Sequence, residues 1–245
     1  MSELYCPICK KEYEANPKVC DCGFEGLEYP TYEGGRLSEE YRRRRLFGIY
    51  KFAKRVLLGE IEYAPSKYSY VSYQGRVLVD CVNEKRGLAL IDPVCEEWQD
   101  SETDQGVLAF KTDIPALIVN TELVQSLFLD ESRVEALLIG KRVKYFRDGI
   151  LLALSPVRYI YAHSENPLFH SENNILFNMD RTRLICYAPY KPEEEYRIPS
   201  SVKVLAAYSF YFPKYLKRLY IPRGTELEQS AITMHPEHPF EIIYE

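Results

Sequence analysis

Four cysteines near the start of the chain have the residue type and the spacing of a metal site. They are Cys6, Cys9, Cys20 and Cys22, arranged as a Cys-Pro-Ile-Cys pair and, after a short stretch, a Cys-Asp-Cys-Gly pair. Two close pairs of thiolates separated by a short stretch can converge on one tetrahedral Zn²⁺. Four thiolates would fill every position, so no place is left for a catalytic water. The sequence therefore predicts one structural Zn²⁺ per chain, in a module over residues 1–30.

This cysteine module contains few apolar residues, so the metal would supply its folding free energy. The two cysteine pairs also resemble the knuckles of the small zinc ribbons that head many bacterial and archaeal proteins. We expect the module and the C-terminal part of the chain to have separate cores. Metal loss would then unfold the module and leave the rest folded.

A run of four arginines, Arg42, Arg43, Arg44 and Arg45, is the second candidate for chemistry, because a basic helix can bind phosphates. Ser38 has the residue type of an N-cap, and the helix should run to about Leu58, with Gly59 as its C-cap. An apolar stripe at helical spacing predicts one buried face: Leu46, Tyr50, Ala53 and Leu57, with Phe47 beside it. Nucleic-acid binding through helix 42–55 is therefore an alternative to an ordinary amphipathic helix.

Two further histidines, His235 and His238, are spaced like metal ligands in the sequence Met-His-Pro-Glu-His-Pro-Phe. The two prolines argue against a helix that would hold both on one face. We interpret them as histidines of a surface loop.

From about residue 112 the chain repeats itself. The dipeptide Ile198-Pro199 recurs as Ile221-Pro222. Five apolar positions also recur at one constant offset, and each unit contains a short alternating strand. The five pairs are Val143 and Val202, Phe146 and Leu205, Leu151 and Phe210, Val157 and Leu216, and Ile160 and Leu219. One unit cannot bury its own apolar face, so stacked units must share a core, as in a solenoid.

The pattern Ile-Pro-x-x-Val-x-x-Leu-x-x-Tyr-x-Phe followed by Tyr-Leu-Lys-Arg-Leu-Tyr-Ile-Pro resembles the BspA-type leucine-rich repeat of bacterial proteins. The resemblance covers about residues 130–245 and implies a leucine-rich-repeat stack. Together with the repeat it predicts such a stack over residues 112–245, which at about four units is short for this family. It also implies a β-hairpin inserted at about 164–197, where two apolar runs flank Met179–Thr182. Such repeats bind proteins, and exposed tyrosines of the strands, Tyr159, Tyr161 and Tyr220, are the predicted contact residues.

Residues 36–111 form a helix followed by a β-rich middle region. An alternating segment around Gln74-Gly75 predicts paired strands, and short apolar runs follow it. The sequence leaves open whether this region is a separate domain or the first turns of the solenoid.

Composition sets the class of protein. The chain has 245 residues, of which 46% are hydrophobic, and its formal net charge is −5. An acidic chain disfavours a general nucleic-acid binder.

The chain has no run long enough for a transmembrane helix and no signal-peptide pattern, so we expect a cytoplasmic protein without membrane contact. Cys81, Cys95 and Cys186 lie among apolar neighbours and are interpreted as buried thiols.

The sequence thus predicts an α+β chain: a zinc ribbon, a helix with a β-rich middle, and a short leucine-rich-repeat solenoid. The predicted function is non-enzymatic binding of a protein partner through the repeat surface. A nucleic-acid-binding regulator is the first alternative. The second is an enzyme with a site in 60–130, although no catalytic motif is present.

Overall fold

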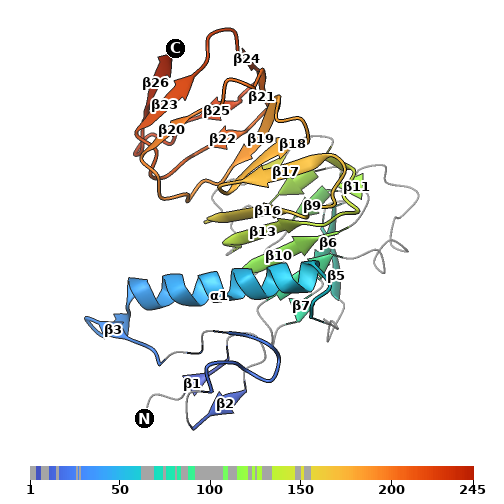
Figure 1. Ribbon diagram of the computed structural model, residues 1–245, viewed down its shortest axis with the longest axis vertical. Helices are drawn as coiled ribbons and strands as arrows, with labels where there is room; N and C mark the ends of the chain where they lie inside the picture. The colour runs from blue at the N-terminus through green and yellow to red at the C-terminus, as the bar shows by residue number, and fades with distance from the viewer. Residues whose placement is uncertain are drawn as a thin grey trace.

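The computed structural model describes residues 4–6, 11–14, 17–25, 27, 29–61, 69–73, 76–80, 82–83, 88–91, 107–109, 115–120, 123–124, 126–128, 134–146, 150–151 and 156–245. The predicted fold class is confirmed. One N-terminal helix and small N-terminal sheets with a cysteine cluster precede a C-terminal β-solenoid of about five turns (Figure 1). The solenoid is thus slightly longer than the four units expected from the repeat.

The N-terminal part consists of two short antiparallel pairs and helix α1 (Glu39–Leu57). The first pair is β1 (Leu4–Tyr5) with β2 (Glu12–Tyr13), and the second is β3 (Tyr32–Glu33) with β4 (Arg36–Leu37). Cys6 directly follows β1 of the first hairpin, and Cys20 and Cys22 lie in the segment between β2 and β3.

Helix α1 begins after the predicted N-cap Ser38, and its C-cap is Leu58 rather than the predicted Gly59. The Ser38 side chain accepts a hydrogen bond from the Tyr41 backbone amide at 3.1 Å, which satisfies one of the helix's unpaired donors. Gly59 has a φ of +73°, as the residue after a helix C-cap often has. The buried residues of α1 are Tyr41, Leu46, Ile49, Phe52 and Ala53. The predicted stripe is only partly correct, because Tyr50 and Leu57 are half-buried and Phe47 is 49% exposed. Within the described ranges, no helix has both the length and the hydrophobicity of a bilayer-spanning segment.

The first half of the solenoid is a stack of parallel strands in three sheets. One sheet orders β16 (Tyr159–Ala162), β13 (Ala136–Ile139), β10 (Ala116–Val119), β8 (Leu88–Ile91) and the antiparallel β7 (Val82–Asn83). The others are β15 (Ile150–Leu151), β12 (Ser126–Phe128) and β9 (Val107–Ala109), and β11 (Leu123–Val124) with β14 (Tyr145–Phe146). Both β8 and β9 precede residue 112, so parallel pairing with the repeats begins within the middle region.

The middle region also contains the predicted antiparallel pair, β5 (Ser69–Tyr73) with β6 (Arg76–Asp80). Its connecting residues Gln74 and Gly75 lie outside the described residues.

The second half of the solenoid opens with antiparallel strands where the hairpin was expected. Strands β17 (Phe169–Glu172), β18 (Ile175–Asn178) and β19 (Arg183–Tyr187) are antiparallel, and β19 then pairs in parallel with β21 (Val204–Leu205), followed by β24 (Glu226–Leu227). The remaining sheets are β20 (Glu195–Arg197), β23 (Arg218–Ile221) and β26 (Glu241–Tyr244), and β22 (Phe210–Tyr211) with β25 (Ile232–Thr233).

Strand register confirms the repeat. Glu195 pairs with Arg218 and Arg218 with Glu241, and both steps equal the interval from Ile198 to Ile221 in the repeated dipeptide. The repeated apolar positions whose side chains are described are 2% exposed or less: Val143, Val157, Ile160, Val202, Leu205, Phe210, Leu216 and Leu219. Phe146 and Leu151 lie in β14 and β15, but their side chains are outside the described residues.

The hairpin strands supply side chains to two different cores. The core of the first half includes Leu176 and Cys186, whereas the core of the second half includes Ile175, Phe177 and Tyr187. Because successive side chains of a strand point to opposite faces, the hairpin forms a wall shared by both cores.

The cysteine module does not have a core of its own, and the expectation of separate cores is wrong. Cys6, Cys20 and Phe24 belong to the same apolar cluster as Phe52 of α1 and Leu138 of β13. Helix α1 therefore lies between the module and the outward face of β10 and β13 (Figure 1). The module, the helix and the first solenoid sheet share one buried interior.

Candidate metal centre and interaction surface

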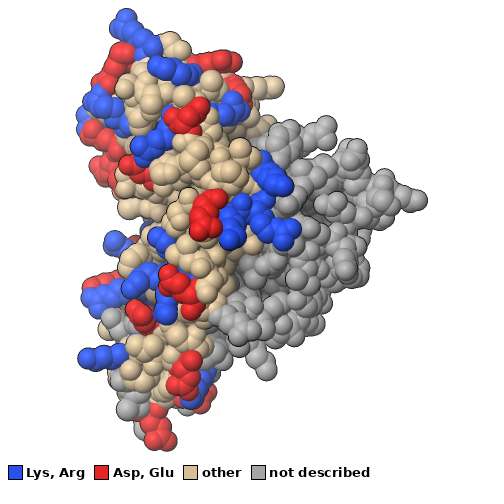
Figure 2. All heavy atoms as spheres, turned by 45° about the vertical axis from the view of Figure 1, so that its right-hand side comes forward, with Lys and Arg blue, Asp and Glu red and all other residues tan. Residues whose placement is uncertain are grey.

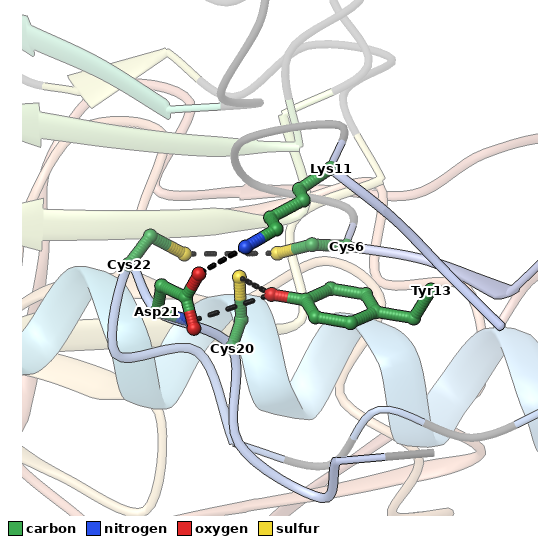
Figure 3. Close-up of polar contacts among 6 residues, drawn as sticks. All are labelled: Cys6, Lys11, Tyr13, Cys20, Asp21 and Cys22. Carbon is green, nitrogen blue, oxygen red and sulfur yellow. Dashed lines mark hydrogen bonds and ion pairs between the residues drawn. The ribbon is translucent and has the colours of Figure 1, made fainter. Parts of the chain in front are cut away.

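Three of the four predicted zinc ligands come together in the structure. Cys6 follows β1, and Cys20 and Cys22 belong to the turn around Gly23 (Figure 3). Their sulfur atoms all lie within 4.8 Å of one another, and Cys6 Sγ is 3.7 Å from Cys22 Sγ. Cys9 lies outside the described residues.

This spacing fits a thiolate-bound metal. Four sulfurs at about 2.3 Å from a tetrahedral Zn²⁺ are about 3.8 Å apart. A disulfide would require about 2.05 Å. Cys6, Cys20 and Cys22 form no disulfide with one another, and sulfur is a donor that suits zinc. The three cysteines could therefore hold a metal without rearrangement.

Hydrogen bonds within the module orient the sulfurs. The Tyr13 hydroxyl donates to Cys20 Sγ at 3.0 Å and accepts a hydrogen bond from the Asp21 backbone amide at 3.4 Å. The hydrogen bond to Cys20 is the main reason that the pKa of Tyr13 rises to about 12. Asp21 also forms an ion pair with Lys11. These contacts fix Cys20 beside the other two sulfurs (Figure 3).

The turn that carries Cys20 and Cys22 requires glycine at position 23. Gly23 has a φ of +85°, and its amide donates to the Cys20 carbonyl at 2.8 Å. Arg55 of α1 donates to the Gly23 carbonyl at 3.0 Å, which ties the turn to the helix. Burial raises the pKa of the Cys22 thiol to about 12.

The arginine run divides between exposed and paired side chains. Arg44 forms an ion pair with Glu40, and the Arg45 guanidinium lies 4.6 Å from the centre of the Tyr5 ring. Arg42 and Arg43 are exposed, and Arg42 attracts the partly buried carboxylate of Glu135. On the face drawn in Figure 2, acidic and basic side chains are mixed over the described surface.

Basic residues further along α1 also contact protein groups. Lys51 and Arg55 both lie within ion-pair distance of Glu25, at 3.7 Å and 3.4 Å. The Lys54 ammonium is 4.1 Å from the centre of the Tyr161 ring. These side chains therefore fasten the helix to the cysteine module and to β16.

None of the three predicted contact tyrosines is fully exposed, which corrects the sequence-based expectation. Tyr159 and Tyr161 are half-buried and pack against the core beneath α1. The Tyr159 ring stacks on Tyr50 of the helix, with ring centres 4.7 Å apart. The sequence showed that both the helix and the strand had apolar faces, but it did not show that these faces meet.

Tyr220 lies on the equivalent strand of the second half, where the outward face is open to solvent. Strand register aligns two columns of outward side chains there: Glu195, Arg218 and Glu241 in one, and Arg197, Tyr220 and Ile243 in the other. The four charged residues are exposed, and Tyr220 and Ile243 are half-buried. We call these six residues the open strand face.

Contacts within the open strand face hold its side chains in place. The Arg197 guanidinium lies 4.3 Å from the centre of the Tyr220 ring, and the Tyr220 hydroxyl donates to Glu195 at 3.3 Å. Arg218 forms an ion pair with Glu195. Sequence reasoning found Tyr220 but not Arg197 and Arg218, although the alternation of side chains along each strand places them on the same face.

Comparison with known proteins gives only distant similarity. No known family model matches the sequence, and no curated protein matches it. Among solved structures, the pneumococcal vaccine antigen PcpA is similar at a TM-score of 0.30 and 16% identity, over 75% of this chain and 69% of that one. A leucine-rich repeat protein of Eubacterium ventriosum matches at 0.28 and 15% identity, over 66% of each chain. A leucine-rich cell surface protein of Faecalibacterium prausnitzii matches at 0.31 and 12% identity, over 75% of this chain and 76% of that one. At TM-scores this low, the fold is defined by the strand register described above.

Proposed function

We propose that this chain is a non-enzymatic binding protein and that it holds another protein on the open strand face. The observation that carries the proposal is the pair of outward columns on β20, β23 and β26. Parallel strands lie about 4.8 Å apart, so the columns form a nearly flat, regularly spaced surface. Tyrosine and arginine are the residue types that most often dominate protein interfaces.

The open strand face is also partly pre-organised. Arg197 lies over Tyr220, and Arg218 is paired with Glu195. Side chains that are already ordered lose less conformational entropy when a partner binds. The alternation of Glu195, Arg218 and Glu241 favours a partner with charges of both signs rather than a polyanion.

In the first half of the solenoid, the equivalent strand face is covered by a segment of the same chain. By the constant offset that relates the two halves, Tyr161 is the counterpart of Tyr220, and it contacts Lys54 of α1. Helix α1 covers that equivalent face within the same chain. This arrangement supports the proposal that a segment of another protein packs on the second half.

We further infer that the cysteine module binds one structural Zn²⁺ through Cys6, Cys20 and Cys22, with Cys9 as the fourth thiolate. A metal bound by four thiolates supplies folding free energy and no open position for catalysis. Seven cysteines, an odd number with four in metal-type spacing, suit the reducing, cytoplasmic location that we propose.

The first test is capture of partners from the native host with immobilised full-length protein. We expect Arg218→Glu and Tyr220→Ala to lose the partner that the unchanged protein retains. Arg181→Ala is the matched control, because Arg181 is also paired with a glutamate and its side chain is 44% exposed, against 49% for Arg218. A partner retained by both face variants, or lost equally by the control, contradicts the assignment to this face.

Nucleic-acid binding through α1 is the competing function, favoured by the exposure of Arg42 and Arg43. We expect no appreciable DNA or RNA binding at about 150 mM salt, because each phosphate contact weakens as counterions are added. Electrophoretic mobility shifts over a salt series measure this. Binding that survives physiological salt and is abolished by Arg42→Glu with Arg43→Glu would reverse the ranking.

The enzyme alternative, placed at 60–130, remains a prediction. Most of that segment lies outside the described residues, including Trp98, around which a polar pocket would have favoured an enzyme.

A further inference from the structure

A second group of metal-ligand side chains lies in the turn after β25. His235, Glu237 and His238 each offer one ligand atom, and these atoms lie within 4.8 Å of one another. Backbone hydrogen bonding closes the turn. His235 and His238 form an antiparallel bridge, and the His238 amide donates to the His235 carbonyl at 3.0 Å.

The sequence-based interpretation of this segment as a surface loop is correct, but the loop gathers the side chains that a helix would not. The backbone bridge brings the two imidazole rings to 5.5 Å between centres. Pro236 and Pro239 restrict the backbone beside them. His235 is half-buried, and its ring meets Phe212 edge-on with centres 5.3 Å apart, so part of the site is fixed by packing.

We propose that this turn binds one divalent ion of the late first-row series, of which Zn²⁺ is the natural example. Two imidazoles and one carboxylate suit zinc, nickel and copper better than magnesium or calcium. Three protein ligands leave at least one coordination position for water or for a group of another molecule. This site would lie at the opposite end of the molecule from the cysteine module (Figure 1).

The hydrogen bonding of His235 gives the site a specific spectroscopic signature. The Glu237 backbone amide donates to His235 Nδ1 at 3.2 Å, so Nδ1 carries the lone pair of the neutral ring. A metal bound to Nδ1 would occupy the lone pair that accepts this hydrogen bond. A metal on Nε2 requires the proton on Nδ1 instead. Binding through either nitrogen therefore breaks the hydrogen bond of the Glu237 amide.

The test is a Zn²⁺ titration of ¹⁵N-labelled full-length protein, followed by amide and imidazole NMR correlations. We expect a saturable change in the Glu237 amide and in both imidazoles, separate from changes at Cys6, Cys20 and Cys22. His235→Ala and His238→Ala should abolish it, and Glu237→Gln should weaken it. His170→Ala on β17 is the matched control and should leave it unchanged.

The proposal is overturned if excess Zn²⁺ leaves the Glu237 amide unmoved, or if the double variant His235→Ala with His238→Ala binds the same additional zinc. The remaining amide correlations of each variant show whether it is folded. Because the signals belong to the turn itself, zinc binding at the cysteine module does not affect the conclusion.

Discussion

Removal of metal from the cysteine module, or the substitution Cys20→Ser, is expected to loosen helix α1 and the first solenoid sheet along with the module. Structural zinc contributes about 10–16 kcal/mol to small zinc-binding peptides, so the effect should be large. It should spread because Cys6 and Cys20 share a core with Phe52 and Leu138. Hydrogen exchange read by mass spectrometry, with and without chelator, measures it.

Strands β23 and β26 serve as the internal control, because they belong to the core of the second half. Their exchange should change far less than that of α1. If chelation frees residues 4–25 while α1 keeps its protection, the shared core does not transmit the loss. If elemental analysis finds well under one zinc per chain even after reconstitution, the proposed Zn²⁺ is refuted.

Phe210→Ala is expected to destabilise the second half by about 3–5 kcal/mol, the range for truncating a buried aromatic side chain. Phe210 is fully buried, and its ring stacks on Tyr187 with centres 5.0 Å apart. Urea unfolding measures the free energy. Leu227→Ala is the control, because Leu227 is 40% exposed, and its cost should stay within about 0.5 kcal/mol. Equal costs at the two positions would contradict the repeat register.

The repeat was predictable where its spacing is regular. Ala136 pairs with Tyr159, Glu195 with Arg218 and Arg218 with Glu241, and one constant sequence interval separates the partners in all three pairs. Towards the N-terminus the interval varies. It is longer from Leu88 to its partner Ala116 and shorter from Ala116 to Ala136. Variable connections hide a period in sequence, although the strands still pair. The sequence therefore predicts a β-rich middle region but leaves open whether it is a separate domain or the first turns of the solenoid.

The cysteine cluster was also predictable, because metal geometry imposes a local spacing that survives in the sequence. What covers Tyr159 and Tyr161 was not predictable. The apolar stripe of α1 shows that the helix is buried on one side, but many apolar surfaces would satisfy it. Only the tertiary structure reveals that Tyr50 meets Tyr159 and that Lys54 meets Tyr161.

The inserted hairpin has a consequence for which core each side chain of β18 enters. Side chains alternate between the two cores along β18, so a slip by a single position would send Leu176 into the second core and Phe177 into the first. The two-residue turn at Asn173 and Asn174 fixes the register of β17 against β18. Both residues have positive φ, as a type I′ hairpin turn requires. An insertion in this turn would therefore change the register of β17 against β18, and with it the core that each side chain of β18 enters.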